Sequence, residues 1–276
     1  MKKRRINLFN AVGYIVLIAV MLIVVLPLIW LLVSSFKSDA EAIQWPPIFF
    51  PTQWLTVQYE YVVQTIPVLQ MLGNTIIFAT GVTAISLFFD AMAAYAFARM
   101  RFRGRNVLFG IILLTMMIPF QVVMIPLYLE EYHLNILNTY AGLILPRAAS
   151  AYGIYMLTSF FSGIPKSLDE AARIDGMGEW KIYSRIILPL SKPALVTLGI
   201  YHFMNNWNDL LYPMMLTTSV EMRTLSAGLA ILVGSNSIRI GPTLAATVIS
   251  VAPLLILFLF GQRFFMEGIA TSGMKE

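Results

Sequence analysis

Six long apolar stretches, separated by clusters of charged residues, constrain the fold of this chain more than any other feature of its sequence. A helix needs about 20 apolar residues to cross the ~30 Å hydrocarbon core of a bilayer. Backbone amides and carbonyls find no water in that core, so these stretches are expected to be helices. We therefore predict an all-α polytopic membrane protein with six transmembrane helices, at about residues 11–33, 72–98, 105–130, 141–161, 193–216 and 243–262.

The composition excludes other large classes of protein. Hydrophobic residues make up 58% of the chain and charged residues 12%, whereas a soluble domain is nearer half apolar and a quarter charged. Because cysteine is absent, a disulfide scaffold, a thiolate nucleophile and a Cys-ligated metal are excluded. The uncharged run at residues 6–36 is too long for a signal peptide, so we interpret it as a retained first span. We expect one membrane domain, 1–276, with a core at about 72–264.

Lysine and arginine are distributed unevenly between the two sides of the predicted bundle. Fifteen of the 19 lie in the two termini and in two loops, 99–105 and 162–192. Such a bias places both termini in the cytoplasm. The net charge of +5 then reflects topology, and we expect lipid rather than nucleic acid as a partner. The outside loops are predicted at about 34–71, 128–140 and 217–242.

The predicted cytoplasmic segment 162–192, which we call the signature loop, does not resemble an ordinary connection. Ser167 can cap a helix, and Glu170 follows three residues later as in a capping box. Gly176 can end that helix with a positive φ, and a second short helix can run from 179 to 187 before Pro189. The loop is either a protruding helix–turn–helix that another protein can grip, or an amphipathic loop that lies on the lipid headgroups.

The spacing within the signature loop resembles that of binding-protein-dependent ABC importer permeases. The pattern is Glu-Ala-Ala, three residues, Gly, nine residues, Ile, one residue, Leu-Pro. Further segments, Ile-Asp-Gly at 174–176, Trp-Asn-Asp at 207–209 and the run 140–146, resemble the carbohydrate, maltose-like branch of that family. The resemblance extends roughly from the second span to the C-terminus, and the length is similar to that of the smaller permease of a maltose-type pair.

This resemblance implies a mechanism and a set of partners. The signature loop would dock as a coupling helix in a cleft of a separate cytosolic ATPase. Two copies of this ATPase would be present, and they would hold ATP and Mg. The docked loop would convert closure of the ATPase dimer into alternating access. A homologous second permease and an extracytoplasmic solute-binding protein would complete the complex, and its location would be a bacterial-type inner membrane. This chain would bind no cofactor and no metal and would catalyse no reaction, since no Gly is followed by Lys and a P-loop is therefore absent. The implied ATPase-coupling residues are Glu170, Ala171, Ala172, Asp175, Gly176, Ile186, Leu188 and Pro189.

Polar side chains inside predicted spans are candidates for a solute path, because such groups are costly in lipid and normally face protein or water. Asn and Asp can bond hydroxyl groups, and Trp can stack on a sugar ring. The same residues can instead hold helices together by hydrogen bonds. The resemblance adds that the larger partner permease makes most of the sugar contacts. The candidate residues are Gln121, Asn205, Asn206, Trp207, Asn208 and Asp209.

Other ionisable groups carry alternative interpretations. Asp90 is interpreted as a buried acid bonded to a neighbouring helix, although an ion-coupled secondary transporter, the alternative function, would also need such an acid. Arg147 is expected to be a group of the outer vestibule of the bundle or of an interface, rather than a buried charge. His133 and His202 are expected to be structural rather than metal-binding. Pro119 and Pro126 should kink the third span and free backbone carbonyls beside Gln121. The kink is either a gate hinge or a local distortion in which Gln121 only satisfies those carbonyls.

The segment 232–242 before the sixth span is small and flexible in composition. The resemblance implies that it reaches into the binding protein, whereas its composition alone fits an ordinary Gly/Ser connection. The candidate contact residues are Gly234, Ser235, Asn236 and Ser237. An intramembrane enzyme has no support in the sequence, which lacks paired acids and a Gly-x-Ser-x-Gly motif.

Overall fold

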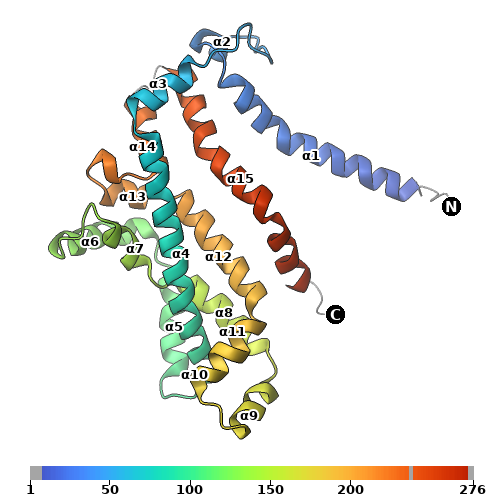
Figure 1. Cartoon of the computed structure of the whole chain (residues 1–276), viewed down its shortest axis with the longest axis vertical. Coiled ribbons are helices and arrows are strands. Elements are labelled where there is room, and N and C mark those ends of the chain that lie inside the picture. The colour runs from blue at the N-terminus through green and yellow to red at the C-terminus, as the bar shows by residue number, and fades with distance from the viewer. Residues whose placement is uncertain (1–7, 236–238, 273–276) are drawn as a thin grey trace. The chain divides into compact units, whose positions relative to one another are not determined.

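The computed structural model describes residues 8–235 and 239–272, and every regular element in these ranges is a helix (Figure 1). The chain divides into two compact units, Met1–Ile66 with Leu229–Pro253 and Pro67–Gly228 with Leu254–Glu276. The elements are α1 (Leu8–Ser34), α2 (Asp39–Ile43), α3 (Val57–Thr65), α4 (Val68–Arg99), α5 (Arg105–Thr115), α6 (Phe120–His133), α7 (Tyr140–Ile144), η1 (Leu145–Arg147), α8 (Ala151–Gly163), α9 (Lys166–Ile174), α10 (Glu179–Ile182), η2 (Tyr183–Ile187), α11 (Leu188–Leu190), α12 (Lys192–Trp207), α13 (Leu211–Leu216), η3 (Val220–Met222), α14 (Leu225–Ser235) and α15 (Ile240–Ser272).

Membrane-spanning helices are clear at two of the six predicted positions. Among the described residues, α1 (over 12–34) and α4 are each long and apolar enough to cross a bilayer. Two further candidates are pairs of helices bent at a short break: α5 with α6, at 99°, and the 179–190 helices with α12, at 78°. The count of such spans is therefore two, or four if each bent pair is one span, and the six-span topology stays a prediction.

Proline and polar side chains explain why three predicted spans are interrupted. Pro119 is the N-cap of α6, so the third span breaks outright at residues 116–119 where a kink was expected. The fourth becomes α7, the single 3₁₀ turn η1 with Pro146, and α8, whose N-cap Ser150 accepts from the Gly153 amide. The fifth stops at Trp207, and Asp209 then accepts from the Tyr212 amide at the start of α13. The third span thus breaks at a proline, and the fourth and fifth break beside a side chain that accepts a backbone amide.

The first unit is organised around the segment between α1 and α3, which was predicted as a loop. Ser38 and Glu41 form a capping box at the start of α2. Lys37 is buried, with Nζ donating to the Ile48 carbonyl at 2.7 Å and to Ser34 Oγ at 3.1 Å. Its Nζ also lies 4.2 Å from the centroid of the Trp30 ring. Loss of hydration on burial lowers the pKa of Lys37, which the nearby Glu41 partly opposes.

The second unit is built on α4, which packs mainly against α8 and α12. Ala91, Ala94 and Ala98 are buried on α4 and permit close approach of its neighbours. Leu157 and Phe161 of α8 and Leu198 of α12 fill the same core and are fully buried. The core continues into the signature loop through Ala172, Ile182, Tyr183 and Ile187. The loop is therefore packed against the C-terminal end of α4 (Figure 1).

Candidate functional site

The signature loop folds as two helical pieces joined at Gly176, as its sequence predicts. Gly176 has a φ of 77°, in the left-handed region that favours glycine, directly after α9. The second piece begins at Glu179 and runs through α10, η2 and α11 to Leu190. The predicted cap at Ser167 is wrong, because α9 begins at Lys166 after Pro165 and has no side-chain cap. Pro165 lacks an amide hydrogen and has extended backbone, so the chain turns into the helix before Ser167 is reached.

A stretch of π-helix, η2 (Tyr183–Ile187), interrupts the second piece. Its wider turn is shown by the Leu188 amide, which donates to the Tyr183 carbonyl five residues earlier. Pro189 explains this geometry, since its ring has no amide hydrogen and would clash with the carbonyl four residues before it in a regular α-helix. The Leu-Pro of the signature therefore shapes the helix that carries it.

The predicted coupling residues divide into two groups by exposure. Glu170, Ala171, Asp175, Gly176 and Pro189 are exposed, whereas Ala172 is buried and Ile186 and Leu188 pack partly buried against the core. Four large apolar side chains are also exposed on this loop: Ile174 (86%), Trp180 (61%), Leu190 (50%) and Leu168 (41%). One side of the loop thus belongs to the core of the unit, and the other offers an acidic and apolar surface.

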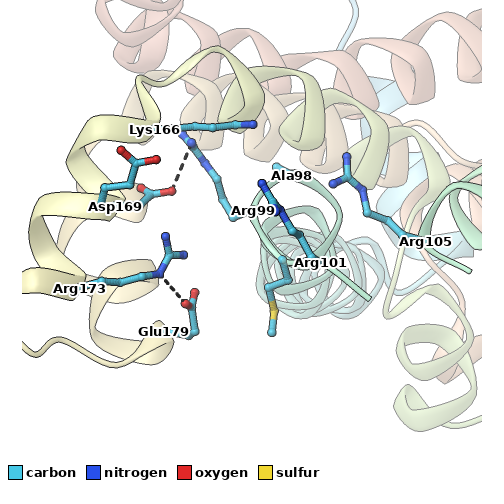
Figure 2. Close-up of a pocket in the computed structure, with 10 residues that line it drawn as sticks. Ala98, Arg99, Arg101, Arg105, Lys166, Asp169, Arg173 and Glu179 are labelled. Atoms are coloured by element: carbon cyan, nitrogen blue, oxygen red, sulfur yellow. Dashed lines mark hydrogen bonds and ion pairs between the residues drawn. The ribbon is translucent and has the colours of Figure 1, made fainter. Parts of the chain in front are cut away.

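Residues that the sequence analysis did not select fasten the loop to α4 (Figure 2). Arg99, the last residue of α4, pairs with Asp169 of α9 at 3.2 Å, and both side chains are buried. Tyr95, one turn earlier, donates to Glu179 Oε2 at 2.6 Å, and Arg173 Nε donates to Glu179 Oε1 at 2.9 Å. The helical period places Asp169 and Ala172 on one face of α9, which is the signal that could have identified Asp169.

A cleft of about 410 Å³ lies between the end of α4 and α9. Figure 2 shows Arg101, Arg105 and Lys166 along it, beside the two ion pairs of Arg99 and Arg173. The cleft contains more cationic than acidic side chains. In the part of the chain that the structure describes, this cleft included, acidic and histidine side chains do not gather in groups of three or more that could hold a metal ion.

Asp90 is the centre of a second polar site, between α4, α8 and α12. Its Oδ1 accepts from the Ser150 amide at 2.7 Å, and its Oδ2 lies 3.0 Å from His202 Nε2. Asp90 is fully buried and His202 is 4% exposed. Gly153 makes the arrangement possible, because a Cβ there would overlap the Asp90 carboxylate. These contacts confirm the interpretation of Asp90 as an acid that bridges neighbouring helices, and His202 is its hydrogen-bond partner.

Arg147 connects the 3₁₀ turn η1 to the end of α12. Its guanidinium donates to Asn206 Oδ1 at 2.7 Å and to Asp209 Oδ2 at 2.5 Å, and it lies 3.8 Å from the centroid of the Tyr212 ring. Ser86 Oγ donates to the Arg147 carbonyl at 2.6 Å. Arg147 is thus partly buried and ion-paired within the unit. It also lines a cavity, and its expected position in an outer vestibule or interface stays a prediction. Asp209 is correspondingly engaged rather than free.

The candidate path residues of the fifth span do not all share one environment. Asn205 and Asn208 are exposed, Asn206 is buried against Arg147, and Trp207 is 2% exposed beside Phe203. The ring faces of Trp207 are covered, so its position does not support the stacking role predicted for it. Asn205 and Asn206, together with residues near Arg147 and Ser150, line a cavity of about 210 Å³.

The remaining candidates lie away from that cavity. Gln121 is exposed in the first turn of α6, just after the 99° break, and His133 is exposed at its end. Gly234 and Ser235 form the last turn of α14, which corrects the expectation of a loop from 232 onward. Asn236 and Ser237 lie outside the described residues.

Comparison with known proteins places these observations in a family. Residues 90–269, more than half of the chain, match the family described as "Binding-protein-dependent transport system inner membrane component". The chain is 34% identical over 256 residues to the arabinooligosaccharides transport system permease protein AraQ of Halalkalibacterium halodurans, an alignment that covers 92% of each. It is 31% identical over 259 residues to the diacetylchitobiose uptake system permease protein NgcG of Streptomyces coelicolor, covering 92% of this chain and 85% of NgcG.

A solved structure gives the same assignment. The fold matches a chain of a bacterial ABC transporter involved in the import of the acidic polysaccharide alginate, with a TM-score of 0.77 and 27% identity. The match covers 96% of this chain and 99% of that one. The signature-loop spacing, the apolar helices and both comparisons agree, and the chain therefore belongs to the family of binding-protein-dependent transport system inner membrane components.

Proposed function

We propose that this chain is a transmembrane permease subunit of an ATP-driven importer for a carbohydrate or a related polyol. Its relatives are named for oligosaccharide uptake, and the fold neighbour belongs to an importer of a polysaccharide. The partners in this proposal are a homologous second permease, two copies of a cytosolic ATPase that hold ATP and Mg, and an extracytoplasmic binding protein. ATP hydrolysis then occurs on the ATPase and not on this chain.

The observation that carries the proposal is the outward side of the signature loop. Glu170, Ile174 and Trp180 are exposed there, while the opposite side of the same helices is packed into the core. An exposed apolar and acidic surface on a rigid support fits a partner protein that offers a basic, partly apolar cleft. Closure of the ATPase dimer would displace α9 and rock the attached helices between outward-open and inward-open states.

The proposal also includes a topology of six spans with both termini in the cytoplasm. Two continuous helices and two bent pairs supply four of these spans, and α7 with α8 and α15 would supply the others. The concentration of lysine and arginine near the signature loop and in 99–105 supports a cytoplasmic position for both. The segment around Gly234 then lies outside, where contact with the binding protein stays a prediction.

A polar cavity beside Asn205 supports a path for a hydroxylated solute. Amide, hydroxyl and imidazole groups line it together with the guanidinium of Arg147, and all of these form hydrogen bonds with hydroxyl groups. An ion-coupled carrier has less support, because Asp90 and Asp209, the two acids that the sequence suggests for coupling, are both engaged with protein groups. Gln121, after the break in α5–α6, is retained as a candidate gate residue.

The experiment is reconstitution of the complete complex in proteoliposomes with its ATPase and binding protein. We expect Glu170→Lys to abolish uptake by removing the acid offered to the ATPase, and Gly176→Pro to abolish it because proline cannot adopt a φ of 77°. Membrane insertion should be unaffected in both. Matched controls are Glu130→Lys, an exposed acid on α6, and Gly178→Ala, at a φ of −78° with open space around it.

Two results would contradict the proposal. Uptake that survives both Glu170→Lys and Gly176→Pro would show that the loop does not couple to the ATPase. Uptake by the isolated chain under an ion gradient, without ATPase or ATP, would assign it to the secondary transporters instead.

A further inference from the structure

The last two turns of α4 hold the signature loop at several points, one of which, the Arg99–Asp169 pair, is drawn in Figure 2. Arg99 Nη2 donates to the carbonyl of Ile164, the C-cap of α8, at 2.7 Å. Its Nη1 lies 3.2 Å from Asp169 Oδ2, and the two side chains are 1% and 4% exposed. One guanidinium thus joins the end of α4 to the end of α8 and to the middle of α9.

Tyr95 lies four residues before Arg99 and therefore on the same face of α4. Its hydroxyl donates to Glu179 at the start of α10, and Glu179 also accepts from Arg173 of α9. The Tyr95 ring packs on Tyr183, with centroids 5.2 Å apart. One face of α4 thus contacts both helical pieces of the loop.

These contacts form a stiff connection. A buried ion pair is weakly screened, and separating it leaves an uncompensated charge on each side. When α9 is displaced, α4 therefore moves with it, because separating the Arg99–Asp169 pair costs more free energy. The same helix carries Asp90, whose carboxylate bridges to α8 and α12 beside the polar cavity.

We propose that Arg99 and Tyr95 are positioning residues that make α4 the element through which movement of the signature loop reaches the membrane helices. This inference rests on the proposed function. Both residues lie on α4, outside the signature spacing, and their role is distinct from docking. They determine how much solute moves for each ATP hydrolysed.

The test uses the assembled transporter in proteoliposomes, with assembly, ATP hydrolysis and solute uptake measured on the same sample. The variants are Arg99→Glu, Asp169→Lys, and the double variant that exchanges the two charges. We expect each single variant to lower uptake per ATP by about tenfold, within the usual range of a coupling free energy, and the exchange to restore most of it. Arg103→Glu, an exposed reversal in the same loop, should leave uptake per ATP unchanged.

A merely structural role would lower the amount of assembled complex and leave uptake per ATP at the wild-type value, and that result would overturn the inference. Failure of the charge exchange to restore uptake per ATP would overturn it as well. Wild-type uptake that needs no ATPase would instead refute the proposed function, so the two failures are distinguishable.

A second measurement does not depend on the stability of charge variants. Spin labels are placed at two exposed sites, Met100→Cys at the end of α4 and Lys166→Cys at the start of α9. The chain has no cysteine of its own, so these are the only labelled sites in this subunit when it is labelled before assembly. We expect the label-to-label distance to be the same in the nucleotide-free and ATP-bound complexes. A change in that distance between the two states would show that α9 moves independently of α4 and would refute the inference.

Discussion

Substitution of Gly153 by alanine is the sharpest test of the buried polar site on α4. A Cβ at this position would overlap the Asp90 carboxylate and come 3.2 Å from His202 Nε2. The backbone of α8 cannot withdraw easily, because Leu157 and Phe161 on the same helix are fully buried. We therefore expect Gly153→Ala to displace the carboxylate and break at least one of its two hydrogen bonds.

Two destabilising effects and one stabilising effect determine the magnitude. Overpacking of a tight core costs about 1–3 kcal/mol, and an interhelical hydrogen bond in a membrane protein is worth about 0.6 kcal/mol and at most about 1.7. Replacing a helical glycine by alanine contributes roughly 0.5–1 kcal/mol in the opposite direction. The steric term dominates, and the net prediction is a loss of about 1–3 kcal/mol in the free energy of unfolding.

The assay is reversible unfolding in mixed micelles at increasing denaturing detergent, with Gly110→Ala as the matched control. Gly110 lies in α5 with open space where its Cβ would be, so alanine there should be neutral or slightly stabilising. Adding Asp90→Ala to Gly153→Ala should recover part of the loss, because the overlap is then absent. Equal stability of Gly153→Ala and Gly110→Ala would refute the reasoning.

Three further predictions concern the loops. Ile174→Ser should change the unfolding free energy by no more than about 0.5 kcal/mol, because Ile174 is 86% exposed. The same substitution should weaken binding of the ATPase subunit in a titration, and unchanged binding would exclude the side chain from the interface. Asn138, which has a φ of 58°, accepts hydrogen bonds from the Thr218 and Ser219 amides through its side chain. Asn138→Ala removes this acceptor, so those two amides should exchange hydrogen faster. Protection equal to that of the wild type would refute this prediction. Because burial lowers the pKa of Lys37, the folded state binds fewer protons than the unfolded state just below the usual 10.5, so stability should rise with pH there. Lys37→Met should flatten that rise in thermal unfolding scans, and an identical slope would contradict the argument.

Local features of the fold and site could be predicted from the sequence, and long-range ones could not. The helix–turn–helix of the signature loop follows from short-range signals such as Gly176 and Pro189, which act on their own backbone. The pairing of Arg99 with Asp169 joins residues 70 positions apart and depends on how α4 and α9 pack, which periodicity does not reveal. The sequence pattern therefore identifies the exposed Glu170 as a coupling residue and gives no role to its buried neighbour Asp169.

Hydropathy likewise identified apolar segments more reliably than continuous helices. The stretch around Arg147 is apolar enough for a span, yet Pro146 and the cap at Ser150 divide it. Averaging over about 20 residues conceals such single-residue breaks, because one capping side chain barely changes the mean. Trp207 shows a different limit. Its polar neighbours in the sequence predicted that it lines a solute path, whereas tertiary packing, which the local sequence does not reveal, covers its ring.

The division of the signature loop into a covered and an uncovered side has a consequence for engineering. Ala172, Ile186 and Leu188 face this chain's own core, whereas Glu170, Ala171 and Ile174 face away from it. A graft that retargets the subunit to a foreign motor protein therefore needs to transplant the second set alone. Exchanging the first set as well would disturb the host scaffold and contribute nothing to recognition.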